Sequence, residues 1–172
     1  MRTEITNGAS PAATPSGTDL AAQLAGKYMT FKLANEIYGL EILKVREIIG
    51  LMDITRVPRS AAFIRGVINL RGKVIPVADL RLTFGMEACQ ATDQTVIIVV
   101  QCLVGGRSLT MGILVDQVLE VLQIESAQIE APPSMGDGAG AESQFILGVG
   151  KAGERVVFLL DIAQVLGGTA AA

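Results

Sequence analysis

The carboxylates best placed for acid–base chemistry are Asp79 and Asp161, each of which directly precedes a short apolar segment. A general acid or base needs a second polar group that converges on the same substrate. The sequence has no histidine, which excludes Ser-His-Asp and Cys-His nucleophiles, imidazole metal sites and phosphohistidine relays. We therefore interpret both aspartates as helix N-caps and expect no enzyme, with a convergent polar cluster of another kind as the enzymatic alternative.

Thiol and phosphate chemistry have little support in the sequence. Cys89 and Cys102 are thirteen positions apart and neither belongs to a C-x-x-C pair, so we interpret them as buried or incidental thiols. The glycine-rich residues 136–140 do not lie between a strand and a Lys-Ser/Thr helix start, as a P-loop requires. We expect no catalytic residue, no cofactor and no metal.

Charge and hydropathy narrow the class of partner. A net charge of −3, a pI near 5.0 and 4% aromatic residues without tryptophan argue against nucleic acid. The strongly apolar run 96–100 is far shorter than the ~20 residues of a membrane helix, so we expect no direct membrane insertion. Residues 1–26 are rich in small and polar residues without an apolar signal region, which predicts a disordered tail and a cytoplasmic protein.

The elements that would position any site come from an internal duplication. Residues 63–85 return in weakened form as residues 145–167, at an offset of 82. A second repeat, at an offset of 73, relates residues 39–49 to residues 112–122. The two offsets differ by nine, which predicts an inserted loop, and the Gly- and Pro-rich residues 131–141 have that composition. The chain therefore reads as two copies of one β-rich unit.

Alternating apolar and polar residues predict strands joined by tight turns. The expected hairpins pair residues 28–33 with 37–42, 66–70 with 73–77, and 95–102 with 109–115, and residues 155–160 form a further buried strand. Arg71 and Gly72 are the predicted turn of the second hairpin, where Gly72 can adopt a positive φ at little steric cost.

Several local features add to this pattern. Residues 43–49 fit a short helix or a strand about equally, and we leave that choice open. We expect a strand at 54–57, then a helical turn over 61–64 that Ser60 caps. Pro76 predicts an edge strand, or a strand whose N–H side faces solvent. Asp79 and Asp161 would cap helical segments that end at Gly85 and Gly167.

The expected fold class is mainly β, because short strands joined by tight turns favour two small barrels over an open sheet. Residues 38–49, 54–58 and 63–82 together resemble the CheW family, the bacterial chemotaxis coupling proteins. The central sequence Phe-Ile-Arg-Gly-Val-Ile-Asn-Leu-Arg-Gly-Lys-Val-Ile-Pro-Val-Ala-Asp-Leu-Arg is long, contiguous and specific for that family. The resemblance implies two five-stranded SH3-like barrels in a domain over residues 27–167, with a boundary between the barrels near 90–94 and a C-terminal tail at 168–172.

The resemblance also implies the function. CheW-like proteins are non-enzymatic adaptors that bind the cytoplasmic tip of methyl-accepting chemotaxis receptors and the regulatory domain of the histidine kinase CheA. It thus implies a cytoplasmic protein that is recruited to membrane-associated receptor arrays. The alternative is a CheW-like adaptor of a chemotaxis-like pathway with another output, such as surface or twitching motility.

The family's receptor-binding positions correspond here to Val45, Glu47, Ile48, Arg71 and Gly72. Further positions that the family associates with coupling correspond to Asn69, Val96, Ile97, Gly112 and Val121. The apolar residues Val96, Ile97 and Val121 fit a buried core better than a contact surface, whereas Glu47 and Arg71 fit partner contact and solvent exposure equally.

The duplication helps to divide fold residues from partner residues. Gly66, Val67, Val74, Asp79 and Gly85 recur in the second copy, so we assign them mainly to the fold. Asn69 and Arg71 do not recur, which favours a role in partner binding.

Overall fold

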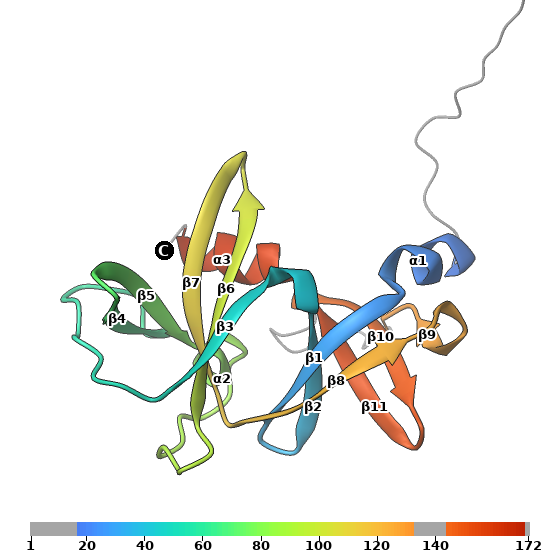
Figure 1. Cartoon of the computed structure of the whole chain (residues 1–172), viewed down its shortest axis with the longest axis horizontal. Helices are drawn as coiled ribbons and strands as arrows, with labels where there is room; N and C mark the ends of the chain where they lie inside the picture. The colour runs from blue at the N-terminus through green and yellow to red at the C-terminus, as the bar shows by residue number, and fades with distance from the viewer. Residues whose placement is uncertain (1–16, 133–143, 171–172) are drawn as a thin grey trace, which may run out of the picture.

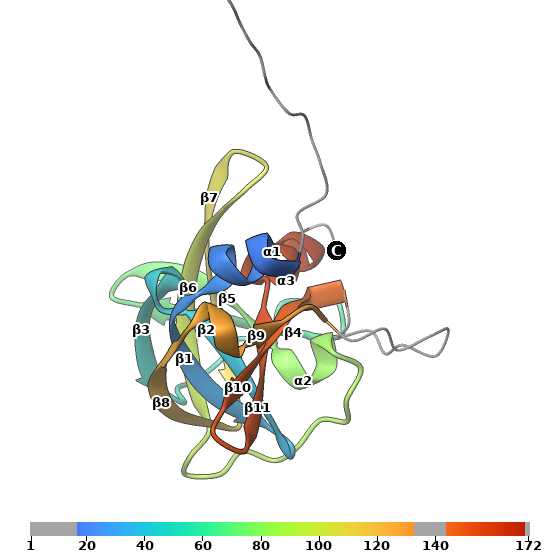
Figure 2. The same ribbon diagram turned by 90° about the vertical axis from the view of Figure 1, so that its right-hand side faces the viewer.

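Two sheets and a few short helices make up the described part of the chain, residues 17–132 and 144–170 of a computed structural model (Figure 1). The first sheet has the order β8-β1-β2-β11-β10-β9. Its strands are β1 (Gly26–Leu33), β2 (Glu36–Glu41), β8 (Gln117–Ile124), β9 (Ile129–Glu130), β10 (Ile146–Ala152) and β11 (Arg155–Leu160). Figure 2 turns this sheet toward the viewer and shows its strands curling around.

The second sheet has the order β3-β6-β7-β5-β4. Its strands are β3 (Val45–Gly50), β4 (Ile64–Leu70), β5 (Lys73–Asp79), β6 (Val96–Val104) and β7 (Arg107–Val115). The helical elements are α1 (Gly17–Leu24), α2 (Leu80–Thr83), α3 (Ile162–Ala170) and the 3₁₀ turns η1 (Ile42–Lys44) and η2 (Ser126–Gln128). The predicted mainly β class is confirmed, with a sixth strand in the first sheet because the two-residue β9 joins its edge.

The two repeat copies exchange their hairpins between the sheets. In the second sheet β5 pairs in parallel with β7, where Val77 lies opposite Gly112. In the first sheet β11 pairs in parallel with β2, where Leu159 lies opposite Gly39. Val77 and Leu159 are related by the offset of 82, and Gly39 and Gly112 by the offset of 73. Each sheet therefore combines half of one copy with half of the other. The expected boundary near 90–94 does not separate the sheets, because β1 and β2 pair with the C-terminal strands.

Each sheet closes partway into a barrel because its edge strand continues to the opposite edge. β8 leads through η2 into β9, which pairs with β10. β3 leads to Thr55, whose N–H and C=O form two 2.8 Å hydrogen bonds with Val67 of β4. The strand expected at 54–57 is wrong beyond this single bridge. The turn expected over 61–64 forms as one hydrogen-bonded turn, in which the Ile64 N–H donates to the Ala61 carbonyl at 3.0 Å, although no helix is assigned there. The Ser60 hydroxyl instead donates to the Val57 carbonyl at 2.8 Å, which uses the group that was expected to cap a helix.

The largest apolar cluster lies between the two sheets and contains side chains from both. Tyr38 stands at its centre, with ring centroids 5.9 Å from Phe31, 5.4 Å from Phe84 and 5.6 Å from Phe158. Phe84 in turn stacks on Phe145 at 5.5 Å. Such contacts add about 0.5–1.5 kcal/mol each beyond the burial of apolar area. A smaller apolar cluster fills the interior of the first sheet, and another fills the interior of the second.

Two of the expected local features are confirmed and one is resolved. The Asp79 carboxylate accepts the N–H of Arg81 at 3.0 Å, so Asp79 is the N-cap of α2. The Asp161 carboxylate accepts the N–H of Gln164 at 3.2 Å in α3. Residues 43–49 form the end of η1 followed by β3, so the strand alternative holds for most of them.

Three expectations about chain ends and edges are wrong. α1 lies within the predicted tail 1–26 and buries Ala21 and Leu24, and the Tyr28 hydroxyl donates to the Leu24 carbonyl at 2.6 Å. α3 runs past Gly167 into the predicted tail 168–172. The edge-strand alternative for Pro76 is wrong, because β5 lies between β4 and β7. The pairing with β7 begins only at Val77, so Pro76 lies outside that ladder, which fits the other alternative. The predicted insertion at 131–141 falls mostly outside the described residues.

Among the residues that the structure describes, no helix is long and apolar enough to cross a membrane.

Asp116, directly after β7, links the second sheet to the first. Its carboxylate accepts hydrogen bonds from Arg81 of α2, the shortest at 2.6 Å, and one from the backbone N–H of Ala34 at 2.8 Å. Both side chains are largely buried, with 17% of Arg81 and 28% of Asp116 exposed. The Arg81 hydrogen bonds hold the pKa of Asp116 below its ordinary value of 3.8.

We predict that Asp116→Asn lowers the free energy of unfolding by about 1–2 kcal/mol at neutral pH, because a charge-assisted network is lost. A carboxyl whose pKa is lowered by folding stabilises the protein above its unfolded pKa and loses that effect as the pH falls through the folded value. The difference between parent and variant should therefore shrink below pH 3.8. Urea unfolding at neutral and acidic pH measures this, with the exposed Asp53→Asn as the control. An equal loss at both pH values would contradict the assignment.

Candidate functional site

The β4–β5 hairpin turn holds Arg71 and Gly72 in a fixed geometry. Arg71 has φ +54° and Gly72 has φ +86°, the pair of positive angles that a two-residue hairpin turn of type I′ requires. The Asn69 side-chain oxygen accepts the Gly72 N–H at 2.9 Å. Asn69 therefore supports the turn, a role that its absence from the second copy did not indicate.

Arg71 and Glu47, which were predicted as two separate charges, bind each other. The Arg71 guanidinium donates two hydrogen bonds of 2.7 Å, one to each carboxylate oxygen of Glu47. The contact joins the hairpin tip to β3, at the opposite edge of the same sheet. These hydrogen bonds lower the pKa of Glu47 and raise that of Arg71. Because 71% of the Arg71 side chain is exposed, the pair orients a charged surface more than it stabilises the fold.

A similar ion pair occurs on the first sheet, between Arg155 and Glu120 at 2.8 Å. Glu120 is the repeat equivalent of Glu47, but the cation comes from the position equivalent to Lys73 and not from that of Arg71. Both halves thus have a glutamate–arginine pair at the same glutamate position, but the arginine comes from a different position in each hairpin. A glutamate–arginine pair therefore occurs in both copies, although Arg71 itself does not recur.

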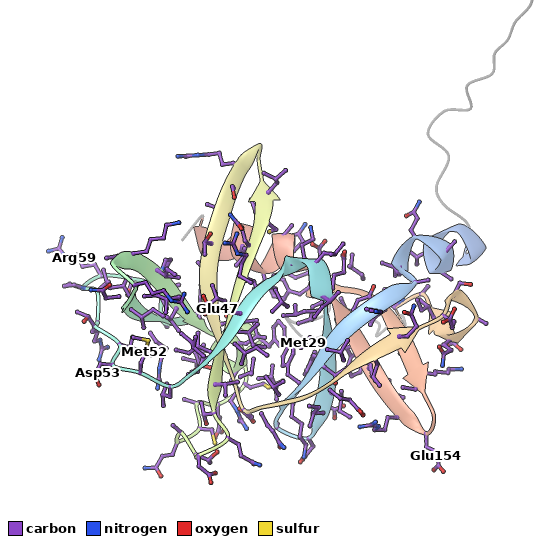
Figure 3. All side chains as sticks on the ribbon, viewed as in Figure 1. Met29, Glu47, Met52, Asp53, Arg59 and Glu154 are labelled. Atoms are coloured by element: carbon purple, nitrogen blue, oxygen red, sulfur yellow. The ribbon has the colours of Figure 1, made fainter. Side chains whose placement is uncertain are left out.

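A groove of about 450 Å³ lies beside the first ion pair, and we call it the tip groove. It is lined by Arg46, Glu47, Leu70, Arg71, Gly72, Lys73, Ile75, Val99, Gln101 and Thr110. The predicted residues Glu47, Arg71 and Gly72 are thereby brought together; Figure 3 labels Glu47 on β3. Arg46 donates to the Gln101 side chain, whose amide donates to Ser108 at 2.9 Å. Sequence reasoning missed Arg46 and Gln101, because this contact joins strands far apart in the chain.

Exposed apolar side chains accompany these charges. Ile48 of β3 is 40% exposed and Val74, beside the hairpin tip, is 66% exposed. Leu51 and Met52 are also exposed after the end of β3. Val74 had been assigned to the fold because it recurs as Val156, yet Val156 is exposed as well. Recurrence therefore marks a shared surface position here: on β5 Val74 is exposed, while the next residue, Ile75, is buried.

The remaining predicted positions differ in burial. Ile97 is fully buried, as expected, and Val45 and Val96 pack partly against the cluster between the sheets. Gly112 is buried opposite Val99 in the β6–β7 pair. Val121, expected in the core, lies on β8 with 49% of its surface exposed. Of the ten predicted positions, Glu47, Arg71 and Gly72 line the tip groove; the others are exposed outside it (Ile48, Asn69 and Val121) or partly to fully buried (Val45, Val96, Ile97 and Gly112).

The acidic and thiol groups of the described residues form no candidate metal site. Within residues 17–132 and 144–170, no group of three or more Cys, Asp or Glu side chains could hold a metal ion. Cys102 is buried, which raises the pKa of its thiol, and Cys89 is exposed. The arrangement suits recognition: an oriented ion pair lines a groove, and nearby positions on β3 and β5 carry exposed apolar side chains outside the groove lining.

Comparisons with known proteins agree on one family. The model of the CheW-like domain matches residues 27–169. The chain is 38% identical over 148 residues to the chemotaxis protein CheW of Klebsiella aerogenes, with 86% of each chain covered. It is 30% identical to the chemotaxis protein CheW of Thermotoga maritima, covering 80% of this chain and 85% of that one. The crystal structure of the scaffolding protein TtCheW from Thermoanaerobacter tengcongensis matches with a TM-score of 0.70 and 35% identity, covering 83% of this chain and 92% of that chain.

We predict that Gly112→Ala disturbs the core behind the tip groove. An added Cβ would lie 2.7 Å from the Ile97 Cγ2 and 3.4 Å from the Val77 Cγ2. Such overpacking should lower the free energy of unfolding by about 1–3 kcal/mol. Gly50→Ala is the matched control, because a Cβ there meets nothing within 4 Å. Equal urea midpoints for the two variants would contradict a packing role for Gly112.

Proposed function

The chain belongs to the CheW family of chemotaxis scaffolding proteins, and on that basis we propose that it couples methyl-accepting chemotaxis receptors to the histidine kinase CheA. It does so as a non-enzymatic adaptor. The proposed partners are the cytoplasmic tip of the receptors and the regulatory domain of the kinase. The proposed location is the cytoplasm, where receptor binding recruits the chain to arrays at the membrane.

The observation that carries this proposal is the tip groove with its bidentate ion pair. Helical partners dock an apolar face into a groove, while a few charges fix their register. Here Ile48 and Val74 offer exposed apolar surface, and the Glu47–Arg71 pair offers oriented charge at the hairpin tip. We propose that the receptor tip binds at this surface and contacts Val45, Glu47, Ile48, Arg71 and Gly72.

The ion pair suits a reversible contact. Both side chains are already held in place by each other, so a partner need not order them, which lowers the entropic cost of binding. Arg71 keeps 71% of its side chain exposed and retains free donors, since only two of its five N–H groups are used. A carboxylate of the partner can therefore bind Arg71 while Glu47 keeps it oriented.

The buried positions Ile97 and Gly112 take a different part in this proposal. They lie behind the tip groove, on the same strands β6 and β7 whose residues Val99 and Thr110 line it. We propose that they affect coupling by setting the shape of the groove and not by touching a partner. Val96 packs instead against the cluster between the sheets, and Val121 lies on the first sheet as a separate exposed contact.

We predict that Arg71→Ala and Glu47→Ala each weaken receptor binding by roughly tenfold, because each removes half of the oriented pair. The measurement is a titration of a receptor signalling fragment with purified chain, with circular dichroism to verify the fold. Arg155→Ala is the matched control, since it breaks the corresponding pair on the other sheet. Equal losses in Arg71→Ala and Arg155→Ala would argue against a specific role for the tip groove.

A charge swap separates contact from scaffolding. The double variant Glu47→Arg with Arg71→Glu preserves an opposite-charge pair but inverts the charge at the tip. If the partner binds the Arg71 charge directly, receptor binding stays lost in the swapped chain. Recovery of parental binding would show that the pair only holds the hairpin in place. If the parent binds neither the receptor fragment nor the kinase domain, the adaptor proposal itself fails.

A further inference from the structure

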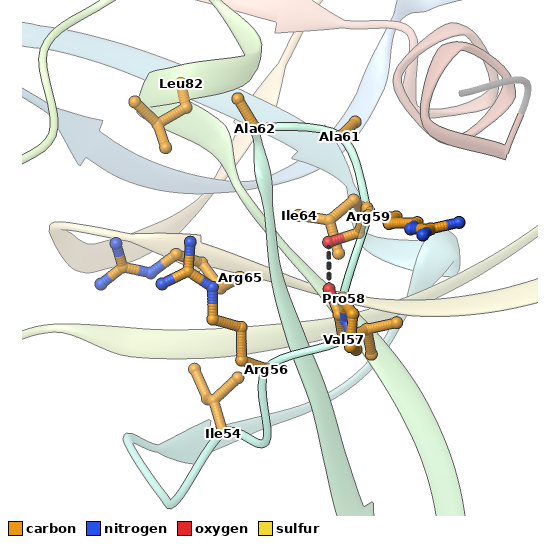
Figure 4. A pocket seen from close by; sticks show the side chains of 11 residues that line it. Ile54, Arg56, Val57, Pro58, Arg59, Ala61, Ala62, Ile64, Arg65 and Leu82 are labelled. Atoms are coloured by element: carbon orange, nitrogen blue, oxygen red, sulfur yellow. Dashed lines mark hydrogen bonds between the residues drawn. The ribbon is translucent and has the colours of Figure 1, made fainter.

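A second cleft lies at the other end of β4, beside the segment that links β3 to β4 (Figure 4). Its volume is about 430 Å³, and we call it the arginine cleft. Three arginines line it, namely Arg56, Arg59 and Arg65, in a chain whose net charge is −3. Figure 4 shows the Arg56 and Arg65 side chains extending to one side of the cleft and Arg59 to the other. The positive charge is therefore a local feature of this cleft, not of the chain as a whole.

The three cations have little compensating charge within the described part of the chain. Arg65 lies 3.8 Å from the Asp79 carboxylate, the outer limit of an ion pair, and 41% of its side chain is exposed. Arg56 and Arg59 form no ion pair with any residue that the structure describes. Arg56 and Arg65 extend to the same side of the cleft, so an anion bound there lowers the electrostatic energy of both.

The backbone around the cleft is held firmly. The two Thr55–Val67 hydrogen bonds fix the start of the segment, and Gly66 allows that approach because a Cβ there would lie 2.1 Å from the Thr55 carbonyl oxygen. Arg59 has φ +62°, a left-handed conformation that is unfavourable for a residue with a side chain. The Ser60–Val57 hydrogen bond secures the same turn. A site ordered before binding loses less entropy when a ligand arrives.

The rest of the lining indicates the class of ligand. Ile54, Val57 and Leu82 give the cleft apolar walls next to its cations. A free phosphate would leave these walls uncovered, whereas a peptide with an acidic side chain beside an apolar one covers both. No aromatic side chain lines the cleft, so it lacks the stacking surface that single-stranded nucleic acid uses.

We propose that the arginine cleft binds an acidic, partly apolar segment of a partner protein. The inference rests on the proposed adaptor function, which requires a second surface that stays free while the first is occupied. β4 runs from Ile64 to Leu70, so its rise of ~3.3 Å per residue separates Arg65 from the hairpin tip by roughly 20 Å. Partners can therefore bind at the tip groove and the arginine cleft together.

The test reverses the charge of the two arginines that have no ion pair to lose. The variant Arg56→Glu with Arg59→Glu is titrated against a receptor signalling fragment, a kinase regulatory domain and vesicles of anionic phospholipid, at low and high salt. We expect roughly tenfold weaker binding to one of the two proteins at low salt, with a smaller difference at high salt. Arg107→Glu with Lys27→Glu is the matched control, because it makes the same change of net charge at exposed sites elsewhere.

Each other outcome counts against the inference in a recognisable way. If the parent binds both proteins and the reversed variant binds them equally well, the arginine cleft is no partner site although the adaptor function stands. If the control variant loses as much affinity as the reversed variant, the effect comes from net charge and the site is rejected. Binding of the parent to anionic vesicles, lost in the variant while protein binding is unchanged, would assign the cleft to a membrane surface. If the parent binds neither protein, both proposals fail.

Discussion

Parallel pairing between exchanged hairpins is the constraint on which the rest of the structure depends. β5 lies against β7 and β11 against β2, so neither sheet can be completed from one repeat copy alone. The close contacts at Gly39 and Gly112 fit this arrangement: an added Cβ would lie 3.1 Å from Val157 at the first and 2.7 Å from Ile97 at the second. The exchange also brings the two sheets together over one aromatic cluster centred on Tyr38.

The two candidate surfaces follow from how the second sheet closes. β3 and β4 are its opposite edges, and two contacts join them: the ion pair from Arg71 to Glu47, and the hydrogen bonds between Thr55 and Val67. The first contact forms one wall of the tip groove, and the second fixes the base of the arginine cleft. Residues that close the barrel therefore also present its recognition surfaces, at the two ends of β4.

Much of the fold could be predicted from the sequence because its signals are local. The turn at Arg71 and Gly72 and the cap at Asp79 depend on residues a few positions apart, and both were predicted correctly. The hairpin exchange could not be predicted, since internal repeats show that two units are alike but not which strands pair. Val74 was misassigned for the same reason: a repeated position can be repeated on a surface. The ion pair between Glu47 and Arg71 joins strands 24 positions apart, so two plausible site residues gave no sign that they bind each other.

The exchanged hairpins set an order of events during synthesis of the chain. The second sheet has all its strands once Val115 has been made, and can form while the chain is still growing. The first sheet begins earlier, with β1 and β2, but the second neighbour of β2 is β11, which ends at Leu160. β2 must therefore keep an open hydrogen-bonding edge through most of translation, the state in which strands pair wrongly with other chains. A nascent chain stalled before β11 would expose this edge, and the last strands to be made are those that cover it.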